Sequence, residues 1–206
     1  MIIEACVETY DEAILAEERG ADQIELCSEL IRDGLTPEKE LISRVTSSLS
    51  IPVKVMVRPR AGDFMYDLRE LESMIETIAF CKDSNVKGVV FGILDTNNEP
   101  DMRAIAELAG FARPLEVTIH KAIDLTPDPL HSLRKLLESD NIFSILTSGG
   151  KKTAKAGSGV IRQMILLAGD ALQIIAAGSI TRENLETIHK EIGASAYHGR
   201  RIVGRL

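Results

Sequence analysis

The sequence is poor in the residues that build disulfide frameworks and nucleic-acid interfaces. It has three cysteines and no tryptophan among 206 residues, and aromatic residues make up only 4%. A small, odd number of cysteines does not form a disulfide framework, so we expect free thiols in a reducing compartment. Acidic residues (31) outnumber lysine and arginine (24), which gives a net charge of −7. Because proteins that grip phosphate backbones are usually basic, this balance argues against nucleic acid as the main partner.

The chain also lacks a long apolar run. A membrane span needs about 18 such residues, and the stretch 163–177 is interrupted by Asp170. The first residues lack the basic segment of a signal peptide. We therefore expect a cytoplasmic protein with no membrane partner. The remaining composition, 45% hydrophobic and 27% charged, is that of an ordinary globular protein, and we expect one domain over residues 1–206.

What is present is a regular alternation of short β-branched runs with stretches of helical periodicity. The eight runs begin near Ile2, Asp22, Val53, Gly88, Leu115, Ile142, Leu172 and Ala194. Strand–helix–strand order is the βαβ unit of a parallel sheet. Eight units without a long interruption predict a compact (β/α)8 TIM barrel, whose eighth helix must be short or missing because few residues follow the last run. The alternative is an open doubly wound sheet, but no Gly-x-Gly-x-x-Gly motif follows the first run.

Capping residues indicate several helix boundaries. Thr9 opens a helix, with Glu12 three residues later as in a capping box, and Gly20 ends that helix. Thr36 precedes a proline suited to the first turn of the next helix. Thr181 is expected to open the last helix.

The alternation of side chains along the strands separates an apolar outer face from an inner face with many polar residues. The ionisable and thiol residues predicted to point inward are Glu4, Cys6, Glu25, Cys27, Lys54, Arg58, Glu116, His120 and His198. Cys6, Cys27, Arg58 and His120 are the last on their strands, so they should meet at the C-terminal mouth, where barrel enzymes hold their active sites. The alternative is that the inward charges only neutralise one another as a structural network.

The loops expected at this mouth carry signs of an anion-binding site. Arginines after the third strand suit a carboxylate or phosphate, although they can equally pair with nearby carboxylates. Glycines after the sixth and seventh strands let backbone N–H groups approach an oxyanion. The candidate anion-binding residues are Arg60, Ser148, Gly149, Gly150, Gly178 and Ser179. The basic segment 151–159 is either a lid over the anion or a solvated linker.

Several blocks of the sequence, taken together, resemble one known family. They are residues 4–7 (EACV), 20–27 (GADQIELC), 34–37 (GLTP), 56–60 (MVRPR), 62–64 (GDF), 88–94 (GVVFGIL), 120–124 (HKAID) and 146–150 (LTSGG). These blocks resemble the CutC family, whose members are described as cytoplasmic copper-homeostasis proteins. The resemblance implies a (β/α)8 barrel, a homodimer or higher homo-oligomer, and Cu(I) ligands at Cys6 and Cys27.

Two functional hypotheses follow. In the first, Cys6 and Cys27 bind Cu(I), which soft thiolates select, and His120 is a candidate third ligand. In the second, the protein is an enzyme for a small anionic or phosphorylated metabolite. Glu25 would then act as general base, His120 as acid, and Arg58 would stabilise developing negative charge. Neither hypothesis implies an organic cofactor, and a purely structural or interaction role is the third alternative.

Overall fold

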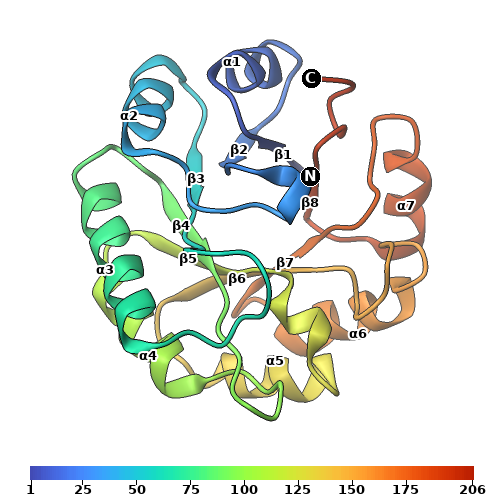
Figure 1. Ribbon diagram of the computed structural model, residues 1–206. Helices are drawn as coiled ribbons and strands as arrows, with labels where there is room; N and C mark the ends of the chain where they lie inside the picture. The colour runs from blue at the N-terminus through green and yellow to red at the C-terminus, as the bar shows by residue number, and fades with distance from the viewer.

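The computed structural model describes residues 1–206, which form eight parallel strands closed into a barrel and surrounded by helices (Figure 1). Each strand pairs with the next along the chain, and β8 pairs with β1. The strands are β1 (Ile2–Val7), β2 (Gln23–Leu26), β3 (Val53–Met56), β4 (Gly88–Phe91), β5 (Glu116–Ile119), β6 (Ile142–Thr147), β7 (Gln173–Ala176) and β8 (Ala196–Gly199). The predicted (β/α)8 barrel is therefore confirmed.

Seven α-helices form the outer ring. They are α1 (Tyr10–Glu18), α2 (Lys39–Ser48), α3 (Leu68–Lys82), α4 (Met102–Ala112), α5 (Pro129–Leu137), α6 (Ser158–Ala168) and α7 (Leu185–Ile192). Two short 3-10 helices, η1 (Leu30–Arg32) and η2 (Lys121–Leu125), lie in the loops after β2 and β5. None of these helices is both long and apolar enough to cross a bilayer.

Residues 200–206 occupy the place of an eighth helix, as the sequence predicted. They run along the outside of the barrel between α1 and α7 (Figure 1). Ile202 and Val203 are buried in the hydrophobic core, and the guanidinium of Arg19, at the end of α1, donates to the carbonyl of Arg205. The apolar outer face that an eighth helix would shield is thus covered by a segment of turns.

The capping predictions are confirmed for α1 and wrong for α2 and α7. The Thr9 hydroxyl accepts the backbone N–H of Glu12 at 3.1 Å. The Thr36 hydroxyl instead accepts the backbone N–H of Arg58, and α2 begins three residues later. Thr181 forms a β-bridge with Arg201, so α7 starts at Leu185.

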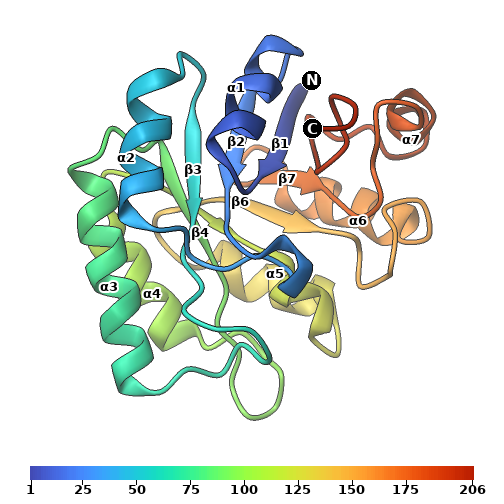
Figure 2. The ribbon, with the colours of Figure 1, turned by 45° about the horizontal axis from the view of Figure 1, so that its top comes forward.

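The strands separate two environments. Outward residues such as Ile24, Val55 and Val89 are fully buried against the helices. Inside the barrel, polar groups pair with one another, and the hydroxyls of Thr118 and Ser144 lie 2.7 Å apart. All strands end at the same edge, where long loops such as those following β3 and β4 gather (Figure 2). These loops build the mouth of the barrel.

Candidate functional site

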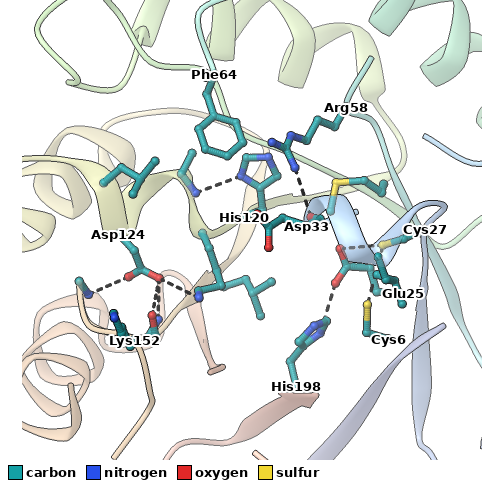
Figure 3. Close-up of a pocket in the computed structure, with 18 of the residues that line it drawn as sticks. Cys6, Glu25, Cys27, Asp33, Arg58, Phe64, His120, Asp124, Lys152 and His198 are labelled. Carbon is teal, nitrogen blue, oxygen red and sulfur yellow. Dashed lines mark hydrogen bonds and ion pairs between the residues drawn. The ribbon is translucent and has the colours of Figure 1, made fainter. Parts of the chain in front are cut away.

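A cavity of about 570 Å³ opens at the C-terminal mouth of the barrel. Cys6, Cys27, Arg58 and His120, the four residues that strand alternation placed there, all line it, as Figure 3 shows. Cys6 lies in β1, and the other three follow the ends of β2, β3 and β5, so the closed barrel is what brings them together.

The two cysteines lie side by side on the cavity floor. The strand register pairs Cys6 with Glu25, so Cys27 lies two residues further along its strand than this partner, and the two cysteines are not at corresponding positions. Their Sγ atoms are nevertheless 3.9 Å apart, and both side chains are buried. Two neighbouring parallel strands therefore present a converging thiol pair.

The two thiols differ in acidity. The hydrogen bond from Cys27 lowers the pKa of Cys6 to about 6, against the opposing effect of burial and with help from His198. The pKa of Cys27 is raised well above its ordinary value, because Cys27 donates that hydrogen bond and is itself buried. At neutral pH the pair thus carries one thiolate on Cys6, which is the nucleophilic and metal-binding form of cysteine.

Glu25 and His198 stand next to the thiols (Figure 3). One oxygen of Glu25 is 3.7 Å from the Cys27 sulfur, and the other is 3.2 Å from Nδ1 of His198. Burial raises the pKa of Glu25 to about 8 despite the attraction of His198. Burial alone would lower the pKa of His198, but Glu25, Cys6 and Glu4 raise it well above its ordinary value. Burial thus favours the protonated form of Glu25, and the neighbouring acidic groups favour the cationic form of His198.

Below the thiols, Glu4 is the centre of a buried polar network. It accepts hydrogen bonds from Gln23 at 2.6 Å and from His198 at 2.9 Å, and it pairs with the ammonium of Lys54 at 3.3 Å. Burial would raise the pKa of Glu4, but His198 and Lys54 outweigh it and bring the pKa to about 2. The structural alternative, mutual neutralisation, thus describes Glu4 and Lys54.

Arg58 does not belong to that network. Its guanidinium donates to the carbonyls of Arg32, Asp33 and Gly34, each at 3.2 Å, and to the carbonyl of Gly62 at 3.0 Å. It therefore ties the loops after β2 and β3 together. Since no carboxylate pairs with it, its positive charge remains available to the cavity.

His120 is held as a neutral imidazole. Its Nδ1 accepts the backbone N–H of Ala122 at 3.2 Å, so the ring proton is on Nε2. Burial and the charge of Arg58 lower its pKa to about 3. A Cβ at Gly92 would lie only 2.5 Å from Nδ1, so this glycine makes room for the ring. His120 thus offers a neutral N–H donor, not the protonated acid that the enzyme hypothesis assigns to it.

Acid should destabilise the protein through His120. The folded pKa is about 3, whereas an unfolded histidine titrates near 6.5. Between these values the unfolded chain binds a proton that the folded chain does not, so stability present above pH 6.5 is lost as the pH falls toward 3. At pH 5 the loss is about 2 kcal/mol. Other buried groups, such as Glu25 with its raised pKa, also change the stability between pH 7 and pH 5, but they do so in both proteins. In urea unfolding the wild type should therefore lose about 2 kcal/mol relative to His120→Asn, which keeps an acceptor for Ala122; equal pH dependence in both would contradict the assignment.

The loop after β6 differs from expectation. Its donors do not face an empty anion site, because they already hold the Asp124 carboxylate. That carboxylate accepts the backbone N–H groups of Ser148 and Gly150, each at 2.8 Å, and the hydroxyls of Thr147 and Ser148. The N–H of Gly149 binds the Thr147 hydroxyl. The sequence prediction of free donors here is wrong, because a side chain from η2 fills the place of the ligand.

The structure places the other predicted anion-binding residues outside the cavity. Arg60 pairs with Glu70 at 2.5 Å and with Asp63 at 2.9 Å, the alternative that the sequence left open. The carbonyls of Gly178 and Ser179 accept hydrogen bonds from Ala154 and Asn184. These bonds engage the carbonyls only, so anion binding by the N–H groups of Gly178 and Ser179 stays a prediction.

The segment 151–159 is neither a free lid nor a solvated linker. Ala154 is fully buried and its N–H donates to Gly178 at 2.9 Å, which anchors the segment beside β7. Lys151 and Lys152 reach the cavity wall. The sequence indicated these lysines only as part of the basic segment 151–159, and it gave Asp124 no role beyond its place in the block 120–124.

Comparisons with known proteins agree with the fold. The CutC family model matches residues 1–203. The copper homeostasis protein cutC homolog of Homo sapiens is 39% identical over 96% of this chain and 72% of its own length. A family protein CutC of Mesorhizobium japonicum is 36% identical over 96% of this chain and 76% of its own.

A solved structure agrees as well. The crystal structure of CutC from Streptococcus agalactiae superposes with a TM-score of 0.93 at 30% identity and covers 98% of this chain and 99% of that one. The family model and the relatives both span nearly the whole chain, including both cysteine-bearing strands. This chain therefore belongs to the CutC family.

Proposed function

We propose that this protein acts in cytoplasmic copper homeostasis and binds Cu(I) through Cys6 and Cys27. The observation that carries the proposal is the pair of buried sulfur atoms 3.9 Å apart on the cavity floor. Soft thiolates favour Cu(I) over hard divalent cations. The printed names of the mouse and human relatives, copper homeostasis protein cutC homolog, support the same role.

The spacing of the sulfur atoms fits one bridging ion. With metal–thiolate bonds of about 2.3 Å, two sulfurs 3.9 Å apart subtend an angle of roughly 115° at the ion. This angle suits a three-coordinate ion better than a linear one. The Glu25 carboxyl lies within 4.8 Å of both sulfurs, but as a hard oxygen donor it would be only a weak third ligand for Cu(I). His120, the third ligand considered from sequence, does not belong to that group.

A second cluster of ligand-type side chains fits a metal less well. Glu4, Glu25 and His198 also lie within 4.8 Å of one another. However, the two carboxylates already share the Nδ1 proton of a cationic His198. A metal here would have to displace that proton and would meet hard oxygen donors, which Cu(I) disfavours. The thiol pair is therefore the better copper site.

Removing both thiols should abolish tight Cu(I) binding. We expect Cys6→Ser/Cys27→Ser to lower the affinity by roughly a hundredfold or more, because losing ligands costs more than losing their outer hydrogen-bond partners. Competition with a Cu(I) chelator measures this affinity. Cys81→Ala is the matched control, since Cys81 is buried in α3 away from the cavity. Equal Cu(I) affinity in the double variant and the wild type would overturn the proposal.

A further inference from the structure

The cavity is far larger than a copper site needs. It has a volume of about 570 Å³, within the range of small-molecule pockets, whereas the two thiols occupy only its floor. Its walls combine apolar side chains with polar ones; the apolar side chains are Leu30, Met56, Phe64, Leu125 and Leu146. Such a mixture suits an organic molecule with an apolar part and a few polar groups.

The charged side chains of the cavity walls indicate whether that molecule is an anion or a cation. Four lysine and arginine side chains line the cavity: Arg58, Lys121, Lys151 and Lys152. The lining has three acidic side chains, and of these Asp124 is already bound by the loop after β6, which leaves Asp33 and Glu25 against the four cations. Neither Lys151 nor Lys152 has a carboxylate within 4 Å, although the chain as a whole carries a charge of −7. A cationic pocket in an acidic protein favours an anionic ligand.

One buried donor in the wall has no partner in the protein. His120 is 4% exposed, and its Nε2 makes no hydrogen bond although Nδ1 is satisfied. An unpaired buried N–H costs free energy, so a ligand acceptor that meets it gains affinity. The Phe64 ring lies edge-on to the imidazole, with ring centroids 4.8 Å apart, and covers this side of the cavity (Figure 3). A ligand reaches Nε2 when this phenyl ring turns aside.

We infer that the cavity above the thiols binds a small organic carboxylate, with its charge beside Lys151 and Lys152 and an acceptor oxygen on Nε2 of His120. Phosphate esters fit less well. Proteins usually cradle phosphate with backbone N–H groups, and here Asp124 occupies those of Ser148 and Gly150. The lysine side chains at the rim attract carboxylates and phosphates alike as point charges, so the preference for a carboxylate rests on the occupied N–H groups. The ligand site goes beyond the copper proposal, because it uses different residues.

Titration calorimetry on the metal-free, full-length protein tests this inference. The probes are malonate, succinate, malate and citrate, with inorganic phosphate and glycerol phosphate as the phosphate arm. We expect at least one carboxylate to bind with a Kd below about 1 mM. Lys151→Gln/Lys152→Gln should weaken it about tenfold, whereas Lys155→Gln, in the same segment but outside the cavity, should not change it. His120→Asn should weaken binding as well, and the surface lysine pair keeps the test valid if that buried variant fails to fold.

The copper and carboxylate sites can be told apart with the same proteins. Cys6→Ser/Cys27→Ser should lose Cu(I) but keep the carboxylate, and Lys151→Gln/Lys152→Gln should do the reverse. The inference is overturned if no carboxylate binds more tightly than about 10 mM, if the lysine variant binds as the wild type does, or if either phosphate compound binds more tightly than every carboxylate.

Discussion

Replacing Glu4 with glutamine should lower the free energy of unfolding by about 3–5 kcal/mol, the usual cost of removing one member of a buried ion pair. The side chains of Glu4 and Lys54 are 2% and 1% exposed. Without the carboxylate, the Lys54 ammonium has no anion within ion-pair distance, and His198 loses its closer carboxylate partner. Guanidinium-induced unfolding at pH 7 measures the effect.

The reverse substitution should be milder. In Lys54→Met the Glu4 carboxylate keeps its hydrogen bonds from Gln23 and from the cationic His198, so we expect about half the loss seen for Glu4→Gln. The double variant Glu4→Gln/Lys54→Met should be more stable than Glu4→Gln alone, because no unpaired charge is left. Losses of less than 1 kcal/mol for Glu4→Gln, or strictly additive effects, would show that the network contributes no specific pairing.

Asp124→Ala should cost about 2–4 kcal/mol of stability, because it leaves the buried donors of Thr147 and Ser148 without their carboxylate partner at roughly 1–3 kcal/mol each. The carboxylate holds the N–H groups of Ser148 and Gly150 and the hydroxyl of Thr147. Hydrogen exchange should accelerate at Ser148 and Gly150, which report directly on the lost bonds. Chemical unfolding gives the accompanying free energy.

Lys121→Ala is the control for this prediction. Its ammonium lies 3.9 Å from the Asp124 carboxylate and is 43% exposed, so removing it should cost less than 1 kcal/mol. Comparable losses in both variants would mean that charge, and not the hydrogen bonds, holds the loop.

The fold was predictable because the eight strand-type runs in the sequence correspond to the eight strands of the closed barrel. Alternation along each strand separates faces regardless of the neighbouring strand, and so it placed Cys6, Cys27, Arg58 and His120 at one mouth. Alternation does not reveal how far neighbouring strands are staggered. In the structure Cys6 is paired with Glu25 and not with Cys27.

The partners of the predicted site residues were less accessible from sequence. Arginines and glycine-rich loops indicate an anion, but the sequence does not show whether that anion is a ligand or a carboxylate of the same chain. Glu70 supplies it for Arg60, and Asp124 supplies it for the loop after β6. These carboxylates lie 10 and more than 20 residues away along the chain, so only the folded backbone brings them into reach.

The pairing of β8 with β1 has a consequence for biosynthesis. The first strand contributes Glu4, yet its neighbour His198 is made 194 residues later. At ribosomal speeds of about 5–20 residues per second, the growing polypeptide spends roughly 10–40 s with this edge strand unpaired. Until β8 emerges, the nascent protein exposes an open sheet edge, and this is the interval in which a chaperone would protect it most from aggregation.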